Sequence, residues 1–364
     1  MRIGFVSPRY LPYKGGVETL VQAIAERLAA AGHQVEVLTL VDSAELPEIE
    51  VVNGVTVRRF KKWLPGDVFI VGLPLYFYLR AHWKDYDVVN AHSYHAMPLF
   101  WTGLVCPELL IASTHYHGKG HSRLANVLHP FYRPFGSWAV RRSQQVICAS
   151  QFEQELVCTH FRVSQEKTVI VPDGIPLASL RTALPFELPG VTLLYVGRLE
   201  QYKRVDLAIA ALACLPENYQ LYVIGKGPEE QPLRQQTMDA RVSERVSFLK
   251  NVPDAELFRW YRSAQVLVMM SEAESFPMTS LEALAAGCRI VCNSNPPFTE
   301  LAQRFPQDIL AADNTSPQAL ASRIQSAAEI AGRASADLHD YSWDTVAQST
   351  LKVFEFVESL PEGN

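Results

Sequence analysis

The sequence predicts an α/β protein made of two consecutive doubly wound domains. Short, almost continuous apolar runs alternate with amphipathic segments of helix length, which is typical of parallel strands covered on both faces by helices. This alternation lapses once, around residues 177–190, and then restarts, so we expect a linker there. The length of 364 residues also suits two domains at roughly 150 residues each.

The first half opens with a strand, a loop, a helix and a second strand. An apolar run at residues 3–6 precedes a loop that contains two prolines and the pair Gly15 and Gly16. Apolar residues then recur at helical spacing, Gly32 stands at the expected helix end, and a strand begins at Val35. Such a unit requires a parallel sheet with a right-handed crossover. Further strands are predicted at residues 87–90, 109–113, 146–149 and 169–171.

The second half repeats the pattern. A strand at residues 191–196 leads into the loop GRLEQYKR and then a helix, and further strands are predicted at residues 221–224, 246–249, 266–270 and 289–292. We therefore assign domains to residues 1–180 and 181–340, and a last amphipathic helix to residues 341–364. Ligands of open α/β sheets bind beyond the carboxyl ends of the strands, so we expect the site in a cleft between the two domains.

Composition excludes several classes of protein. Hydrophobic residues make up 48% of the chain, which argues against disorder, and six scattered cysteines without a C-x-x-C motif argue against a disulfide scaffold. The net charge of −5 disfavours a general nucleic-acid binder. The N-terminus lacks the apolar core of a signal peptide, and the longest uncharged run is too polar to span a membrane. We expect a cytoplasmic protein with free thiols.

Two cations and a glycine pair suit a diphosphate. Arg198 and Lys203 lie in the loop after the first strand of the second domain. An arginine can form a bidentate pair of hydrogen bonds with a phosphate, and a lysine attracts it as a point charge. Gly15 and Gly16 precede the first helix, where backbone N–H groups can approach phosphate. The alternatives are solvated surface charges and an ordinary tight turn.

The segment SEAESFPMTSLEALAAGCRIVC is the most informative. Glu274 lies in the loop after a strand, and Glu282 lies eight residues later in a helix that we expect to begin near Thr279. The first carboxylate can accept hydrogen bonds from sugar hydroxyls and the second from a ribose, while the N–H groups of Met278 and Thr279 can bind phosphate. A helix with two solvated glutamates is the alternative.

Taken in order, these motifs resemble the retaining glycosyltransferases of the GT-B fold. The family in question is the large family-4 type, which includes bacterial α-mannosyl- and α-glucosyltransferases of lipid and polysaccharide assembly. The N-terminal GGVE, the GRLEQYKR loop, the E-x7-E pattern followed by ALAAGCRIV, and the final YSWDTVAQSTLKVF stand in the family order and span the whole chain. The resemblance implies two Rossmann-like domains, the first for the acceptor and the second for the nucleotide sugar, with the last helix crossing back to the first domain.

The resemblance also implies site residues. Arg198 and Lys203 would stabilise the departing diphosphate, Glu274 would bind the donor sugar, and Glu282 would bind the ribose. A histidine after a strand of the first domain would face the donor sugar, and His117 matches this position better than His115. The catalytic set is therefore His117, Arg198, Lys203 and Glu274. The donor-binding set is Gly15, Gly16, Arg198, Lys203, Leu249, Glu274, Ser275, Phe276, Met278, Thr279 and Glu282. Two departures are Pro277 and Lys250, at positions that are often glycine.

No metal or cofactor is expected. His115, His117 and His121 could supply three zinc ligands, but no H-E-x-x-H motif or cysteine partner accompanies them. The D-x-D sequence at residues 85–87 leads into a core strand, so we assign it a structural role. The resemblance leaves the diphosphate to be neutralised by side-chain cations and helix amides, without a divalent ion.

The predicted function is transfer of a hexose from a nucleotide diphosphate sugar to an acceptor hydroxyl of a glycan or lipid-linked acceptor. The cations at residues 58–62, followed by Trp63 and an aromatic stretch, favour contact with an anionic membrane surface, so peripheral attachment at the inner face of the membrane is also expected. A solvated hairpin followed by a buried helix is the alternative reading of that stretch. The competing functions are a nucleotide-sugar epimerase or hydrolase, which would form product without acceptor, and a non-catalytic nucleotide-sugar-binding protein.

Overall fold

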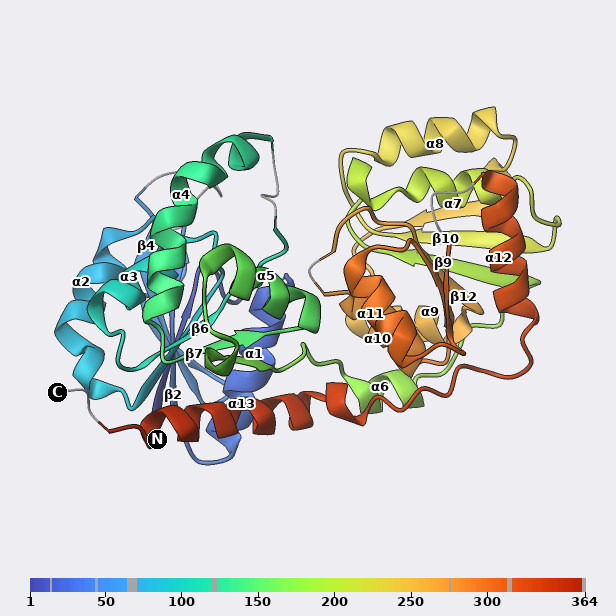
Figure 1. Cartoon of the computed structure of the whole chain (residues 1–364). Coiled ribbons are helices and arrows are strands. Elements are labelled where there is room, and N and C mark those ends of the chain that lie inside the picture. Colours follow the sequence, from blue (N-terminus) through green and yellow to red (C-terminus); the bar gives the residue numbers. More distant parts are fainter. Residues whose placement is uncertain are drawn as a thin grey trace. The chain divides into compact units, whose positions relative to one another are not determined.

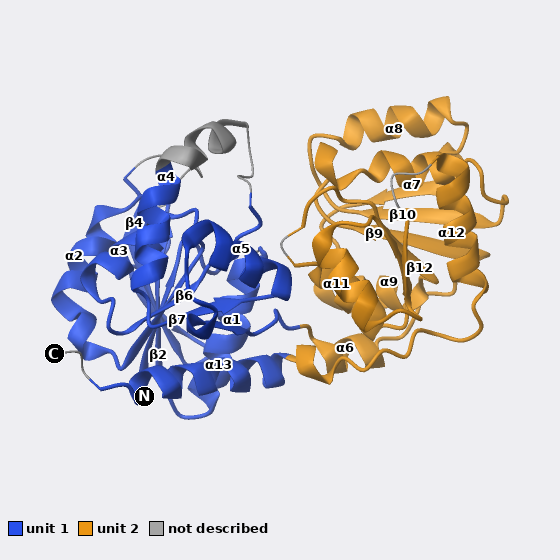
Figure 2. Cartoon of the chain, viewed as in Figure 1, with its two compact units in different colours: residues 1–174, 343–364 blue, residues 175–342 orange. Residues whose placement is uncertain are grey.

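The chain forms two compact units. The computed structural model describes residues 1–13, 15–42, 45–63, 71–118, 123–274, 276–312 and 316–361. Unit 1 comprises residues 1–174 and 343–364, and unit 2 comprises residues 175–342 (Figure 2). Each unit has its own sheet with helices packed against it (Figure 1), which confirms the prediction of two Rossmann-like α/β domains.

The sheet of unit 1 is parallel except at one edge. Among the described residues its strand order is β3-β4-β2-β1-β5-β6-β7-β8, and only β3 runs antiparallel to its neighbour. Chain order reverses between β1 and β5, which makes this the topological switch point. The strands are β1 (Arg2–Ser7), β2 (Gln34–Val41), β3 (Ile49–Val52), β4 (Val55–Lys61), β5 (Val88–His92), β6 (Leu110–Ser113), β7 (Gln145–Cys148) and β8 (Thr168–Ile170).

Helices α2, α3 and α4 pack side by side in unit 1, and α1 packs with α13 (Figure 1). Their bounds are α1 (Gly16–Ala30), α2 (Leu73–His82), α3 (Met97–Val105), α4 (Arg123–Arg142), α5 (Gln151–Phe161) and α13 (Trp343–Glu358). Helix α5 begins at a serine N-cap, since the Ser150 hydroxyl accepts a hydrogen bond from the backbone N–H of Glu153 at 3.1 Å.

Strands β3 and β4 form a hairpin that the periodicity did not predict as strands. Its turn is Asn53-Gly54, and both residues have positive φ, 50° and 82°. That geometry suits a tight two-residue hairpin turn, in which Asn-Gly is the favoured sequence. The hairpin and the following helix α2 correspond to the alternative reading of the basic and aromatic stretch.

The sheet of unit 2 has the order β11-β10-β9-β12-β13-β14, with every pair parallel. Its switch point lies between β9 and β12. The strands are β9 (Val191–Val196), β10 (Tyr219–Ile224), β11 (Val246–Leu249), β12 (Val266–Met269), β13 (Arg289–Cys292) and β14 (Ile309–Ala311). The helices are α6 (Leu177–Thr182), α7 (Val205–Leu212), α8 (Glu230–Asp239), α9 (Asp254–Ser263), α10 (Met278–Ala285), α11 (Pro296–Arg304) and α12 (Pro317–Glu329).

The expected linker at residues 177–190 is wrong in its first part. Residues 177–182 form helix α6, which packs against α9 and α10. Leu180 is fully buried in the core of unit 2. A six-residue helix is too short to show helical periodicity, so only its packing against the rest of unit 2 identifies it. Unit 2 accordingly begins at Ile175, whereas we placed the start of the second domain at residue 181.

The last helix returns to unit 1, as the resemblance implied. Helix α13 packs against α1 and β5, and the Phe354 ring lies 5.8 Å from the ring of Phe5 on β1. The two points where the chain leaves and re-enters unit 1 touch each other, because a Cβ at Gly174 would come within 2.2 Å of the Trp343 ring. Glycine at 174 is therefore required by the packing of the returning helix.

Candidate active site

Three predicted site residues meet at the switch point of unit 2. Arg198 and Lys203 lie in the loop after β9, and Glu274 lies in the loop after β12, at the carboxyl ends of two neighbouring central strands. The backbone N–H of Glu272 donates to the carbonyl of Tyr202 at 2.8 Å, which joins the two loops directly. The sheet topology therefore brings together residues that are about seventy positions apart in the sequence.

Lys203 and Glu274 form a close ion pair. Lys203 Nζ lies 2.7 Å from Glu274 Oε1, and the two side chains are only 13% and 12% exposed. Partial removal from water strengthens the attraction but also makes either charge costly without its partner. The pair places a cation and a strong hydrogen-bond acceptor side by side. The cation can bind a phosphate, and the carboxylate can accept hydrogen bonds from the hydroxyls of a sugar attached to that phosphate.

Arg198 is the most exposed of these charges. Its side chain is 62% exposed, it donates to the Tyr202 hydroxyl at 3.0 Å, and it lies 3.7 Å from Glu200. The backbone is fixed more firmly than the side chain, because the buried Tyr195 hydroxyl donates to the Arg198 carbonyl at 2.8 Å. The Arg198 backbone is therefore fixed, while its guanidinium can still turn its N–H donors toward an anion.

Two glycines after β10, which were not among the predicted site residues, support the Arg198 loop. A Cβ at Gly225 would lie 1.8 Å from the Gly197 carbonyl oxygen, and a Cβ at Gly227 would lie 2.1 Å from that of Leu199. The backbone N–H of Leu199 also donates to the Lys226 carbonyl at 2.8 Å. The G-x-G spacing after a strand is the signal that could have identified this close backbone approach.

Helix α10 carries Glu282 and begins one residue before the expected start. Met278 and Thr279 lie in its first turn, after the N-cap residue Pro277. The Tyr261 hydroxyl donates to Glu282 Oε2 at 2.8 Å. Burial raises the pKa of Glu282 to about 7, despite the opposing effect of this hydrogen bond. The tyrosine partner was not predicted, since it comes from α9, more than twenty residues away.

The remaining donor residues take varied positions in unit 2. Phe276 is half-buried and its ring lies 6.3 Å from that of Tyr341, whereas Ser275 lies outside the described residues. The Leu249 carbonyl at the end of β11 accepts from the Gly225 N–H at 3.0 Å. The departure at Lys250 forms a surface ion pair with Glu230, with 2.7 Å between Nζ and Oε2.

Gly15 and Gly16 lie in unit 1, at the start of α1 and beside the switch strand β1. Gly15 is the N-cap residue and is extended, and a Cβ there would meet only the flexible end of Glu18. A Cβ on Gly16 would have nothing within 4 Å. The described chain itself therefore does not require glycine at position 16.

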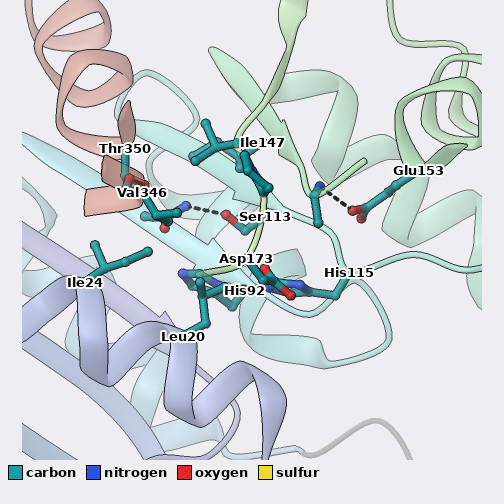
Figure 3. A pocket seen from close by; sticks show the side chains of 14 residues that line it. Leu20, Ile24, His92, Ser113, His115, Ile147, Glu153, Asp173, Val346 and Thr350 are labelled. Atoms are coloured by element: carbon teal, nitrogen blue, oxygen red, sulfur yellow. Dashed lines mark hydrogen bonds between the residues drawn. The ribbon is translucent and has the colours of Figure 1, made fainter. Parts of the chain in front are cut away.

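The two candidate histidines, His115 and His117, both lie in the loop after β6, but their rings have different surroundings. His115 Nε2 lies 3.1 Å from His92 Nδ1, and burial lowers the pKa of both rings. Both line a cavity of about 20 Å³ at the carboxyl ends of β5 to β8 (Figure 3). That volume admits one water molecule but no sugar. The His117 ring instead makes an edge contact with His95, with 5.7 Å between the ring centres.

The basic cluster at residues 58–62 does not present the cations that the membrane prediction assumed. Arg58 pairs with Glu36 at 2.8 Å and stacks on Tyr78, and Arg59 is buried and pairs with Glu50. Lys62 is also buried and lies 2.9 Å from Asp42. Three of the four cations thus neutralise carboxylates of their own unit, and Lys61 is exposed. Residues 64–70 of the aromatic stretch lie outside the described residues, so membrane contact through this segment stays a prediction.

The D-x-D sequence lies at the amino end of β5, away from the ligand edge of the sheet. Asp85 lies 3.1 Å from His82, and Asp87 accepts from the Arg2 backbone N–H at 2.6 Å. Among the described residues, which omit His121, no group of three His, Cys, Asp or Glu could hold a metal ion. None of the helices in the described part of the chain combines the length and the apolar character that a membrane span needs.

Two family descriptions match the chain, one for each half. Residues 14–179 match "Glycosyltransferase Family 4", and residues 180–340 match "Glycosyl transferases group 1". Together these matches cover residues 14–340, which include every candidate site residue.

Individual relatives agree with this assignment. The phosphatidyl-myo-inositol mannosyltransferase of Mycolicibacterium smegmatis is 26% identical and covers 98% of this chain and 94% of the relative. The GDP-mannose:cellobiosyl-diphosphopolyprenol alpha-mannosyltransferase of Komagataeibacter xylinus is 24% identical, with coverage of 100% and 96%. The solved structure of Anabaena HepE in complex with UDP and glucose has a TM-score of 0.75 at 16% identity, with coverage of 99% and 100%. This chain therefore belongs to the family-4-type glycosyltransferases of the GT-B fold and is a hexosyltransferase.

Proposed function

We propose that this hexosyltransferase uses a nucleotide diphosphate sugar, retains the configuration of the sugar, and acts on a lipid-linked or glycan acceptor. The observation that carries the proposal is the Lys203–Glu274 pair, with 2.7 Å between Nζ and Oε1, at the switch point of unit 2. A cation for the diphosphate and an acceptor for the sugar hydroxyls stand there in contact, next to the exposed Arg198.

The proposed step needs no covalent intermediate. The bond between the anomeric carbon and the diphosphate oxygen breaks, and the acceptor oxygen bonds to the same face of that carbon. The acceptor proton passes to the departing phosphate oxygen. Negative charge develops on the diphosphate, so Lys203 and Arg198 would stabilise the transition state more than the bound substrate. Glu274 would hold the sugar, Glu282 the ribose, and the start of α1 at Gly16 would approach phosphate or acceptor.

The similar proteins differ in the nucleotide of the sugar donor. One relative is described as using GDP-mannose, and the HepE structure contains UDP and glucose. The experiment is a thermal-shift panel of UDP-, GDP- and ADP-sugars, because a ligand that binds only the folded protein raises its apparent stability. The stabilising donor is then incubated with acceptors, and the anomeric configuration of the product is read by NMR. An inverted product, or product formed without acceptor, would contradict the proposal.

Nucleotide binding is expected to depend on pH through Glu282. Its pKa of about 7 means that the carboxylate becomes ionised across the neutral range, and only the ionised form accepts from both ribose hydroxyls. We expect affinity for the nucleotide sugar, whose diphosphate carries no group that titrates near neutrality, to rise between about pH 6 and pH 8, and this rise to vanish in Glu282→Gln. Calorimetric titration at both pH values measures it. Equal pH dependence in the variant would assign the effect to another group.

The same shift has a consequence for stability with a defined sign. The folded-state pKa of Glu282 is raised above its ordinary value of 4.5, so the folded protein binds this proton more tightly than the unfolded chain does. Its contribution to stability is therefore lost as the pH rises between about 4.5 and 7. Relative to wild type, Glu282→Gln should gain stability over that interval.

We also propose peripheral contact with an anionic membrane, through helices α2, α3 and α4 rather than through residues 58–62. These neighbouring helices each expose a large apolar side chain, namely Phe77 (62%), Leu104 (46%) and Phe135 (59%). Exposed cations lie on α2 and α4, including Arg80 and Arg133. Apolar side chains that enter the interface and cations that meet lipid phosphates are the two requirements for such binding.

Vesicle sedimentation tests this surface. Phe77→Asp with Phe135→Asp should lower binding to vesicles of anionic phospholipid several-fold, since both apolar contacts are replaced by charges that repel the surface. Phe356→Asp is the matched control, because Phe356 is 50% exposed but lies on α13. Equal binding by the double variant and the control would exclude the α2–α4 surface.

A further inference from the structure

We propose that Glu153 is a positioning residue for hexose transfer, which it supports by holding the loop Thr114–Gly118 so that His117 stands in its working position. This inference rests on the proposed function, in which His117 faces the donor sugar. The structure contributes the observation that a carboxylate from another element fixes the loop from inside the protein.

The contacts of Glu153 join two strand ends. Glu153 lies in the first turn of α5 and is 2% exposed. Its Oε1 accepts from the Thr114 hydroxyl at 2.5 Å and from the Tyr116 backbone N–H at 2.7 Å. Its Oε2 accepts from the Ala149 backbone N–H at 2.8 Å (Figure 3). One side chain thus connects the loop after β6 to the turn after β7.

Both carboxyl oxygens of Glu153 are needed for this arrangement. Its donors are neutral hydroxyl and backbone groups. Burial raises the pKa of Glu153, while these hydrogen bonds lower it. Donors approach both carboxyl oxygens, and a glutamine side chain offers only one acceptor oxygen. A glutamine here would direct its own N–H₂ group at a backbone or hydroxyl donor.

The side chains of the three residues before His117 in the loop all contact other residues of unit 1. The Thr114 hydroxyl binds Glu153, the His115 ring lies against His92, and the Tyr116 hydroxyl lies 3.0 Å from His160 Nδ1. His117 directly follows Tyr116, whose N–H is held by Glu153. The backbone course into His117 is therefore set by the carboxylate. Because a misplacement of about 1 Å can cost about 10²-fold in rate, this support should be visible in kcat.

The test is a double-mutant cycle between Glu153→Gln and His117→Ala. We expect Glu153→Gln alone to lower kcat at least about tenfold, and to change kcat less than about twofold when His117 is already alanine, since residues that act together are not additive. The matched control is Glu36→Gln. Glu36 is also a buried carboxylate of unit 1 (6% exposed), and it accepts from the Tyr86 hydroxyl at 2.6 Å and from Arg58 Nε at 2.8 Å.

We expect both glutamine variants to lower the melting temperature, but Glu36→Gln should leave kcat within about twofold of wild type. A second readout does not need activity: the ring proton resonances of His117, assigned with His117→Ala, should shift in Glu153→Gln and not in Glu36→Gln. Additive kcat effects together with an unmoved His117 resonance would overturn the inference. Absence of transfer by the wild type would overturn the proposed function, while the resonance would still decide whether Glu153 positions His117.

Discussion

Lys203→Ala is expected to lower kcat/KM for hexose transfer by about 10²- to 10³-fold, the usual loss when one group that stabilises developing negative charge is removed. The physical reason is that charge accumulates on the diphosphate as it departs, and Lys203 is the least exposed cation at this strand edge, with its side chain 13% exposed. The variant also leaves Glu274 without its partner at 2.7 Å. Steady-state kinetics with the donor selected by the thermal-shift panel measures the effect.

A matched control separates chemistry from general charge loss. Arg234→Ala removes an exposed cation of unit 2 that pairs with Glu230 on α8, and it should leave kcat/KM within about twofold. Melting temperatures show whether the loss of Lys203 has unfolded unit 2. Turnover near the wild-type level in a folded Lys203→Ala variant would remove Lys203 from the mechanism.

Phe354→Ala is expected to destabilise unit 1 by about 3–5 kcal/mol, the usual cost of removing a fully buried phenylalanine ring. Phe354 is 0% exposed and its ring lies 5.8 Å from that of Phe5 on β1. A substitution near the end of the chain would thus remove packing against the first strand, because α13 belongs to unit 1. Urea denaturation, followed by tryptophan fluorescence and by proteolysis of each unit, measures it.

Phe356 provides the control two residues away on the same helix. It is 50% exposed, so Phe356→Ala should change the free energy of unfolding by no more than about 0.5 kcal/mol. Both variants change helix propensity equally, and only burial differs between them. Similar losses in the two variants would mean that α13 does not form part of the core of unit 1.

Much of the fold could be predicted because buried parallel strands have a strong sequence signature. The predicted run at residues 191–196 is strand β9 to the residue, and the run at 289–292 is β13. The missed elements carry weaker patterns. Strand β14 and helix α6 have three and six residues, which is too short for a period to appear. Strand β3 is an exposed edge strand, so its apolar pattern is incomplete.

The candidate site was predictable in its parts but not in its contacts. The order of Arg198, Lys203, Glu274 and Glu282 along the chain could be interpreted from strand ends and helix starts. Their partners could not. Neither the Tyr261 hydrogen bond to Glu282 nor the Glu153 carboxylate that holds Thr114 and Tyr116 leaves a local pattern, because each joins elements that are distant in sequence.

By itself, the sequence determined that this protein has two α/β domains, that its charged site residues follow strand ends, and that its last helix resembles one that returns to the first domain. Hydrophobic periodicity and loop chemistry are local properties, so they can be read along the chain. Only the tertiary structure decided which charges are available. It paired Arg58, Arg59 and Lys62 with carboxylates, brought Lys203 to Glu274, and directed His115 into the interior. A charge acts through what surrounds it in space, and the sheet topology sets those surroundings.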